Sequence, residues 1–315
     1  MIAYDLWEQG LPAMHETQPQ DTPRYRLSPD CRIAGLRPDQ ASLPQGFEFD
    51  APPAPFSSVW SELMKTILLI GIGSGNPEQI TIQAINALNR AKVFFVLDKG
   101  YANDDLLRLR KDICERYITG DDYRLLQVSD PSREDDPHSY QQGVARWHEQ
   151  RAALFQRLII DEVEAGQTAA FLVWGEPTLY DSTLRVFELI LENSPQLFDY
   201  QVIPGISSVQ ALAAQHRIPL NRIGEPIHIT TGRRLALEHH AAPENTVVML
   251  DAHCTFERFL NQGLHIYWGA YLGTPDEILI AGPLDEVCEQ IKNARAKARQ
   301  EKGWIMDTYL LRNDM

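Results

Sequence analysis

The feature that most constrains the fold is a regular alternation of strand-like and helix-like segments between residues 64 and 217. Apolar runs such as TILLIG (66–71) and TAAFLVWG (168–175) alternate with stretches that predict helices, such as PEQITIQAINALNRA (77–91) and the amphipathic VARWHEQRAALFQRLIIDEVEAG (144–166). Apolar strands that alternate with helices are typical of parallel strands buried on both faces. The pattern therefore predicts an α/β domain with a mostly parallel sheet covered by helices.

The rhythm changes near Ile218, where we place a domain boundary. Short strand-like runs now follow one another closely, and a helix-like segment, LDEVCEQIKNARAKARQ (284–300), comes before a last strand. The runs are IHITTGR, TVVMLDA, HIYWGAYLG and EILIAGP. This spacing predicts a second α/β domain, 218–315, that is more antiparallel than the first.

Residues 1–63 differ from both domains. They hold nine of the chain's twenty prolines, including APPAP (51–55), and show little helical or strand periodicity. Such a segment cannot bury much apolar surface, so we expect a disordered extension. One hypothesis is that translation starts at Met64, where the strand MKTILLIG begins. The polar stretch 131–143 is expected to be a mobile loop.

Composition and charge exclude several classes of protein. At 315 residues and 44% hydrophobic, the chain can bury a sizeable core. A net charge of −14 argues against a nucleic-acid or anionic-membrane partner. The four cysteines are far apart and form no CxxC pair, and His239 and His240 lack further ligands at zinc-like spacing. Without an apolar run of membrane-spanning length, we expect a cytoplasmic protein with reduced thiols and no metal.

Glycine-rich turns follow three of the predicted strands. They are GIGSGNPEQIT (71–81), WGEP (174–177) and VIPGISSVQALAA (202–214). Ligands of open parallel sheets bind at the carboxyl ends of strands. The first turn is a poor dinucleotide fingerprint, because the third glycine would fall at Asn76 and Pro77 occupies the turn into the helix. Each turn alone is more often structural.

Together, in this order and spacing, the three turns resemble those of the tetrapyrrole methylases. That family reads GxGxGxPE followed by LT, then GDP, then PGxSS or PGxTA, and this chain departs from it at Glu176. The resemblance covers residues 64–315. It implies a class III methyltransferase-like fold of two α/β domains with the ligand cleft between them. It also implies S-adenosylmethionine as methyl donor, a macrocycle carbon as acceptor, and a homodimer.

Longer strings narrow the resemblance within the family. They are FFVLDKG, LVWGEPTLYDSTLR, RIPLNRIGEPIHITTGRR, YWGAYLGTPDEILIAGPL and GWIMDTYLLR. They resemble a branch that methylates precorrin-5 at C-1 in cobalamin biosynthesis and releases the acetyl group as acetate. Three alternatives stay open: a precorrin C-methyltransferase of other regiospecificity, an NAD-dependent oxidoreductase, and a non-catalytic tetrapyrrole carrier.

The resemblance assigns donor contacts to residues of the three turns and of the second domain. They are Gly73, Ser74, Gly75, Trp174, Gly175, Glu176, Leu179, Ser207, Ser208, Asp251 and Gly273. For Asp251 a turn acid at a strand end is an equally good interpretation.

The acceptor carries many carboxylates, and an acidic protein would repel it unless the cleft is basic. Candidate cations at predicted strand and loop ends are Lys99, Arg185, Arg222, Arg233 and Arg234, and for each a solvated surface position is the alternative. Arginine forks bind carboxylates in bidentate fashion, so Arg233 and Arg234 are favoured. Tyr180 and Asp181 are candidates for proton transfer during deacetylation, against simple helix capping by Asp181.

Overall fold

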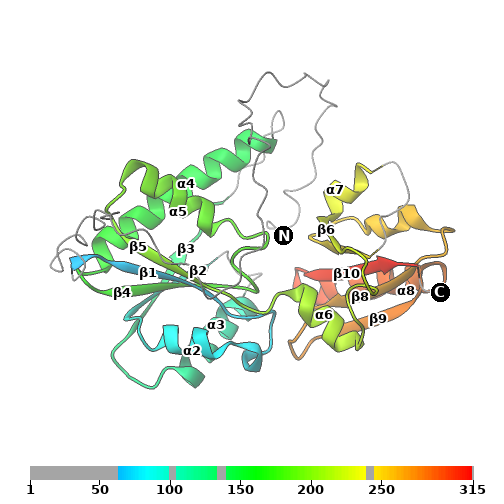
Figure 1. Cartoon of the computed structure of the whole chain (residues 1–315), viewed down its shortest axis with the longest axis horizontal. Coiled ribbons are helices and arrows are strands. Elements are labelled where there is room, and N and C mark those ends of the chain that lie inside the picture. Colours follow the sequence, from blue (N-terminus) through cyan, green and yellow to red (C-terminus); the bar gives the residue numbers. More distant parts are fainter. Residues whose placement is uncertain (1–62, 99–103, 133–139, 239–244, 314–315) are drawn as a thin grey trace, which may run out of the picture.

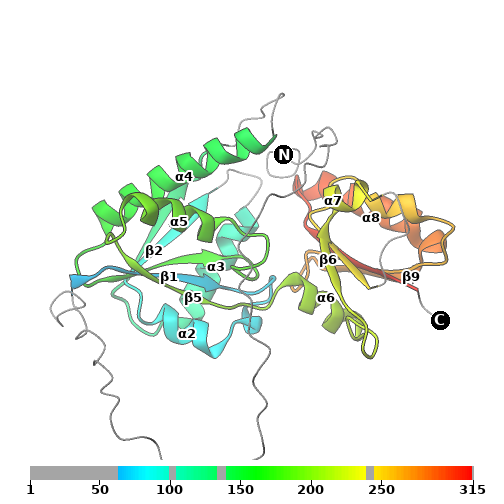
Figure 2. The ribbon, with the colours of Figure 1, turned by 45° about the horizontal axis from the view of Figure 1, so that its top comes forward.

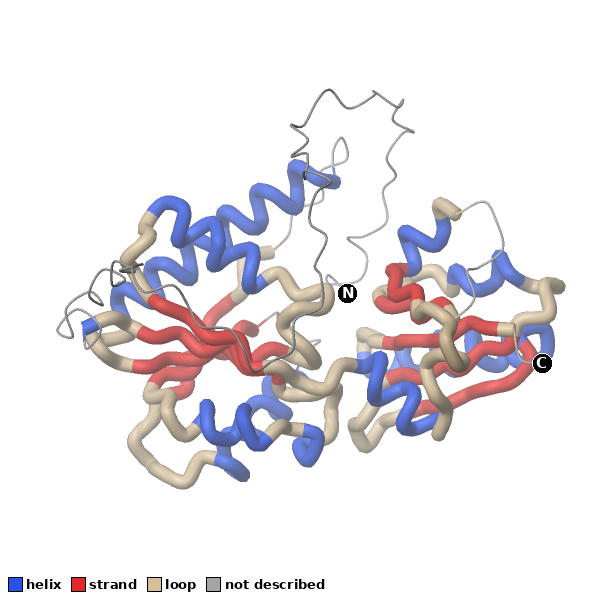
Figure 3. The backbone as a smooth tube through the Cα atoms, viewed as in Figure 1, coloured by secondary structure: helices blue, strands red, loops and turns tan. Residues whose placement is uncertain are grey.

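The computed structural model describes residues 63–98, 104–132, 140–238 and 245–313. They form two α/β lobes that lie side by side and are joined through helix α6 (Figures 1 and 3). The expectations for residues 1–62, for Lys99, for His239 and His240 and for the centre of the 131–143 segment fall outside the described residues. None of the described helices is both long and apolar enough to cross a membrane.

The first lobe contains a five-stranded sheet in the order β3-β2-β4-β1-β5, and every pairing is parallel, as predicted. The strands are β1 (Thr66–Gly71), β2 (Val93–Asp98), β3 (Arg124–Ser129), β4 (Thr168–Val173) and β5 (Asp199–Ile203). Strand β1 lies between β4 and β5, in a register that pairs Gly71 with Val173 and Ile70 with Ile203. The three glycine turns therefore follow the carboxyl ends of three adjacent strands and lie side by side along one edge of the sheet.

Helices cover both faces of this sheet (Figures 1 and 2). One face packs on α2 (Ile82–Leu88) and α3 (Asp104–Tyr117), and the other on α4 (Tyr140–Glu162) and α5 (Thr183–Asn193). Strand residues alternate between the two cores, so Leu68 and Ile70 pack with α2 and α3, whereas Ile67 and Leu69 pack with α4 and α5. Burial of both faces explains why the central strands β1 and β4 are almost wholly apolar, whereas the edge strands β3 and β5 carry exposed polar residues.

The second lobe contains a mixed sheet in the order β6-β7-β10-β8-β9. Its elements are β6 (His228–Thr231), α7 (Gly232–Ala236), β7 (Thr246–Met249), the 3₁₀ helix η4 (Thr255–Phe259), β8 (His265–Ala270), β9 (Ile278–Pro283), α8 (Leu284–Lys302) and β10 (Asp307–Arg312). Strands β6 and β7 are parallel and the other three pairings are antiparallel, in line with the prediction.

Helix α6 (Ser208–His216) packs on the second sheet, although the sequence places the boundary after it, near Ile218. Its Val209 and Leu212 are buried in one cluster with Val247 and Leu310. This packing groups α6 with the second lobe. The partners of α6 on β7 and β10 lie far along the chain, so the local sequence of the helix does not reveal which lobe it packs on.

Two other elements differ from the sequence expectation. The predicted helix over 77–91 is a 3₁₀ turn, η2 (Pro77–Gln79), followed by α2, because extended backbone at Ile80 and Thr81 separates the two. The predicted strand over 227–233 ends at Thr231, whose hydroxyl accepts a hydrogen bond from the Arg234 N–H (3.3 Å) and starts α7. Arg233 and Arg234 thus lie on a short helix.

Candidate functional site

The first two glycine turns are joined by their backbones. Gly73 and Gly175 form an antiparallel bridge in which the Gly175 N–H donates to the Gly73 carbonyl (2.8 Å) and the Gly73 N–H to the Gly175 carbonyl (3.3 Å). The bridge lies just beyond the parallel β1–β4 pairing, which ends at Gly71 and Val173. The two turns therefore form one continuous backbone surface.

The third turn lies against the first two at Gly205. A Cβ added there would lie 2.1 Å from the Gly175 carbonyl oxygen, so only glycine allows this approach. The Glu176 carboxylate fixes the arrangement: one oxygen accepts the Gly205 N–H (2.7 Å) and the other accepts the Thr178 N–H (2.9 Å) and hydroxyl (2.8 Å). Glu176 therefore links the second and third turns, and we call these hydrogen bonds the Glu176 brace.

The second lobe meets the first turn through the loop that follows β8. A Cβ added to Gly75 would lie 2.6 Å from the Leu272 carbonyl oxygen, and one added to Gly273 would lie 2.8 Å from the Asn76 nitrogen. Backbone from both lobes thus comes together beside the three turns. The structure brings the predicted residues Gly73, Gly75, Gly175 and Gly273 into one region.

The serines predicted for the donor site make contacts within the protein. Ser74 is buried and its hydroxyl contacts Gln79 (2.9 Å). Ser207 caps α6 by accepting the Val209 N–H (3.1 Å) and also contacts Gln210. The Thr308 hydroxyl donates a hydrogen bond to the Ser208 hydroxyl (3.0 Å). These contacts define the shape of the turns.

The side of Gly175 toward which a Cβ would project is empty. Its φ is +74°, and a Cβ added to it would meet no atom within 4 Å. The neighbouring Trp174 is half-buried, and Leu179 packs partly against the α6 cluster. Open space beside a glycine backbone, on a junction of two lobes, fits the close approach of a nucleoside and amino-acid ligand.

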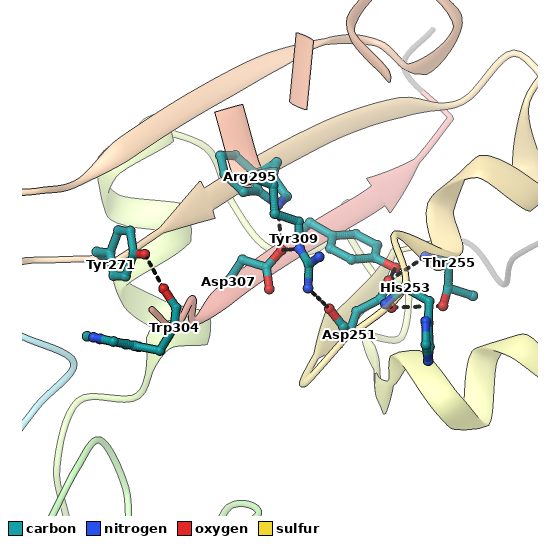
Figure 4. Close-up of polar contacts among 9 residues, drawn as sticks. Asp251, His253, Thr255, Tyr271, Arg295, Trp304, Asp307 and Tyr309 are labelled. Atoms are coloured by element: carbon teal, nitrogen blue, oxygen red, sulfur yellow. Dashed lines mark hydrogen bonds and ion pairs between the residues drawn. The ribbon is translucent and has the colours of Figure 1, made fainter. Parts of the chain in front are cut away.

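Asp251 has a different environment from the glycine turns. It is 2% exposed, and its carboxylate accepts hydrogen bonds from the Tyr309 hydroxyl (2.7 Å), the Thr255 N–H (2.7 Å) and hydroxyl (2.9 Å), and the His253 N–H (3.0 Å) (Figure 4). Four donors occupy both oxygens. The structure favours the interpretation of Asp251 as a turn acid over a contact with the methyl donor.

Asp251 belongs to a buried polar network inside the second lobe (Figure 4). Arg295 donates to the Asp251 carbonyl (2.7 Å) and to the Asp307 carboxylate (3.2 Å), which also accepts the Trp268 indole N–H (2.9 Å). Burial raises the pKa of Asp307, and the Arg295 charge opposes the shift. This network joins β7, β10 and α8, and sequence reasoning did not identify it.

Tyr180 and Asp181 follow the second turn and face different ways. The Tyr180 hydroxyl donates to the Ile229 carbonyl on β6 of the second lobe (3.3 Å), and partial burial raises the pKa of this phenol. Asp181 accepts the Thr183 N–H (2.7 Å) at the start of α5. The Asp181 contact is the capping alternative named above, whereas Tyr180 reaches across the junction.

A buried ionic cluster packs against the residues that follow the second turn. Arg151 on α4 pairs with Asp130 (2.9 Å, each side chain 4% exposed) and donates to the Ser182 hydroxyl (2.8 Å). Arg110 donates to the Leu172 carbonyl (3.1 Å); burial lowers its pKa to about 10, and Asp181 and Asp130 oppose the shift. Sequence reasoning did not identify Arg110, Asp130 or Arg151. The cluster fixes the backbone just beyond the turn.

The predicted basic residues lie on separate elements. Arg185 is exposed on the first turn of α5, Arg222 lies in the turn before β6, and Arg234 is exposed on α7 beside the half-buried Arg233. Their role in binding a polycarboxylate stays a prediction.

One group of acidic and thiol side chains in the described residues has the spacing of metal ligands. Ligand atoms of Glu257, Cys288 and Glu289 lie within 4.8 Å of one another. The Lys292 ammonium contacts both carboxylates, Glu289 at 2.8 Å, and burial raises the pKa of the Cys288 thiol. We interpret the group as a surface ion cluster.

The fold and the convergent turns define a class of enzyme. A family model for tetrapyrrole (corrin/porphyrin) methylases matches residues 66–288, and the chain belongs to this family.

The chain matches almost the whole length of two relatives. A precorrin-6A synthase [deacetylating] from Sinorhizobium sp. is 51% identical over 252 residues, 79% of this chain and 95% of that protein. The crystal structure of a cobalamin-synthesis-related protein, CobF, from Corynebacterium diphtheriae is 41% identical, with a TM-score of 0.69 over 79% of this chain and 99% of that one. A uroporphyrin-III C-methyltransferase from Thermus thermophilus, 18% identical with a TM-score of 0.50, shares the fold.

Proposed function

We propose that the protein is an S-adenosylmethionine-dependent C-methyltransferase of cobalamin biosynthesis that methylates precorrin-5 at C-1 and releases acetate, giving precorrin-6A. The observation that carries the proposal is the convergence of the three glycine turns with the 272–274 loop, in a chain that is 51% identical to a precorrin-6A synthase. A fingerprint-type oxidoreductase would leave the Gly73–Gly175 bridge and the Glu176 brace unexplained.

The donor is proposed to bind on the open side of Gly175, between the turns and the loop at Gly273. When bound, S-adenosylmethionine supplies an electrophilic methyl group on sulfur. Backbone groups of the Gly73–Gly175 bridge provide a rigid surface, and the Glu176 brace keeps the third turn in place. In-line displacement needs chiefly alignment and exclusion of water, which preorganised backbone can provide without a nucleophilic side chain.

The acceptor is proposed to lie beside this surface, with Tyr180 nearest among the candidate catalytic residues. Partial burial raises the pKa of this phenol and so favours its protonated form, in which the hydroxyl donates a hydrogen bond. Release of the acetyl group as acetate needs a water molecule. Asp181 stays a candidate for the accompanying proton, although its carboxylate accepts the Thr183 N–H at the start of α5. Lys99, Arg185, Arg233 and Arg234 are proposed carboxylate contacts.

The experiment that tests the function is a single-turnover reaction with precorrin-5 and S-adenosylmethionine. We expect a product with one added methyl group and one equivalent of acetate. Methylation without acetate would indicate a precorrin methyltransferase of other regiospecificity. In parallel, saturation with S-adenosylhomocysteine at about 100 times its Kd should add about 2.7 kcal/mol to the free energy of unfolding, whereas NAD should add none.

The resemblance also implies a homodimer, which we propose on that ground. Sedimentation equilibrium over a range of protein concentrations should give twice the chain mass. A monomer mass throughout the range would contradict it.

A further inference from the structure

The central strand of the second sheet reaches the third turn through Thr308. Strand β10 lies between β7 and β8, and Thr308 on it is paired with Met249 on one side and Gly269 on the other. Its hydroxyl donates a hydrogen bond to the hydroxyl of Ser208, the first residue of α6, which lies 100 positions earlier in the chain (3.0 Å). Because β10 is hydrogen-bonded on both sides, the Thr308 hydroxyl is held in a fixed position.

The face of β10 that packs on α6 is otherwise apolar. Leu310, two residues beyond Thr308 and so on the same face, is buried in one cluster with Leu212 of α6. Asp307 and Tyr309 alternate with them and belong to the polar network on the opposite face (Figure 4). A valine would fill the position of Thr308 with the same shape and without a buried hydroxyl to satisfy. Apolar packing alone therefore does not account for the threonine.

The burial of the two hydroxyls decides how their hydrogen bond is used. Thr308 is 2% exposed, so its hydroxyl hydrogen needs an acceptor inside the protein, and the Ser208 oxygen is that acceptor. Ser208 is half-buried, and its hydroxyl makes no second hydrogen bond within the part of the chain that the structure describes. With its oxygen engaged by Thr308, the Ser208 hydroxyl can donate its own hydrogen to a group outside the protein.

Ser208 lies where the three turns come together. It is three residues beyond Gly205, which packs against the carbonyl oxygen of Gly175. Ser207 caps α6 by accepting the Val209 N–H, so the start of the helix is fixed as well. A free hydroxyl hydrogen at this position is available to a molecule bound on the turns.

We propose that Thr308 is a positioning residue for the methyl donor: it holds the Ser208 hydroxyl in the orientation that donates a hydrogen bond to an oxygen or nitrogen of S-adenosylmethionine. Thr308 itself does not touch the donor and acts through Ser208. This inference rests on the proposed function, because it concerns the donor that this function requires. A polar group that is oriented in advance binds a ligand at a lower entropic cost, so the benefit appears as affinity.

The test is titration of S-adenosylhomocysteine, the product form of the donor, against variants of the full chain. Thr308→Val keeps the shape of the side chain and removes the hydroxyl, and we expect the Kd to rise about five- to tenfold, as for loss of one hydrogen bond. Thr308→Ser keeps the hydroxyl and should restore the wild-type Kd. Thr230→Val is the matched control, since Thr230 is a buried threonine on β6, two strands from β10 in the same sheet. It should leave the Kd unchanged.

A double-mutant cycle separates this role from a structural one. Ser208→Ala alone should raise the Kd about as much as Thr308→Val does. Thr308→Val added to Ser208→Ala should raise it no further, because the hydroxyl that Thr308 orients is then gone. A loss of affinity that persists in the Ser208→Ala background would assign Thr308 to the packing of the sheet.

Three outcomes would overturn the inference. They are a wild-type Kd in Thr308→Val, an equal rise of the Kd in Thr230→Val, and a rise that persists when Ser208 is already alanine. If the wild type binds no S-adenosylhomocysteine, the proposed donor fails and the inference fails with it. If the binding pattern holds but the wild type releases no acetate from precorrin-5, the proposed reaction fails and the role of Thr308 stands.

Discussion

At the scale of single residues, side chains at the lobe junction shape the candidate site, and a separate set stabilises the second lobe. Tyr180 crosses the junction, whereas Asp251 holds a buried network together. Two buried oxygens in the described residues, on Asn245 and Asp307, have no hydrogen-bond partner in the protein. Buried polar groups are costly unless they are bonded, so substitutions in the network should act on stability.

Tyr309→Phe should lower the free energy of unfolding by about 1–3 kcal/mol at pH 7, because the buried Asp251 oxygen loses one donor. The pKa of Tyr309 is raised well above its ordinary value by burial and the nearby Asp251 charge. The unfolded chain therefore loses this proton first, and the stability that depends on the neutral phenol declines as pH rises above about 10.

Urea unfolding between pH 8 and 11 measures both effects. The wild type should lose stability more steeply than Tyr309→Phe above pH 10, and the affinity for S-adenosylhomocysteine at pH 7 should be equal in the two proteins. A large loss of that affinity in Tyr309→Phe would indicate that Asp251 takes part in binding the methyl donor.

Gly175→Ala should abolish donor binding at a modest cost in stability. The added Cβ projects into the open space proposed for the ligand, and the positive φ costs about 1–2 kcal/mol. Gly263→Ala is the matched control, since Gly263 has a φ of +69° and equally open surroundings in the second lobe. Titration calorimetry with S-adenosylhomocysteine should show binding by the Gly263 variant alone. Normal affinity in both would show that the turn at Gly175 binds no donor.

At the scale of elements, the site depends on the order of strands. Three turns that are far apart in sequence leave the neighbouring strands β4, β1 and β5, and side-chain contacts such as that of Glu176 fix them together. A hydrogen bond to a charged group contributes about 1.5–3 kcal/mol, so the brace is strong enough to set the position of the third turn.

Glu176→Ala should therefore weaken both the fold and the donor site. The Gly205 N–H loses its acceptor, and we expect the free energy of unfolding to fall by about 1–3 kcal/mol and the Kd for S-adenosylhomocysteine to rise severalfold. Glu188→Ala, on the exposed side of α5, removes the same charge elsewhere and should change neither quantity. Unchanged donor affinity in Glu176→Ala would contradict the role of the third turn.

At the scale of the whole molecule, the balance of charge opposes the proposed acceptor. A chain of net charge −14 repels a polycarboxylate unless local cations compensate. Uroporphyrin III, a stable macrocycle with eight carboxylates, serves as a probe for the acceptor. Replacing both Arg233 and Arg234 by alanine should weaken its binding and make its Kd less sensitive to salt. Titrations between 0.05 and 0.3 M salt measure this, since the screening length falls to about 8 Å at 0.15 M.

The control for this variant is the pair Lys111→Ala and Arg157→Ala, which removes the same charge from exposed positions on α3 and α4. It should bind the macrocycle almost as the wild type does. Loss of donor affinity in the Arg233 and Arg234 variant would point to misfolding. Equal loss of macrocycle affinity in both variants would show that net charge alone, and not α7, governs the binding.

The sequence by itself determined the parallel and mixed sheets and the glycine turns, because these follow from local periodicity and from short-range backbone requirements, and its motifs carried the resemblance to the family. Only the tertiary structure decided that β1 lies between β4 and β5, that α6 packs on the second lobe, and that Asp251 faces inward while Tyr180 reaches β6. These depend on contacts between residues far apart in the chain. Such contacts form only when whole elements pack, so no local pattern specifies them.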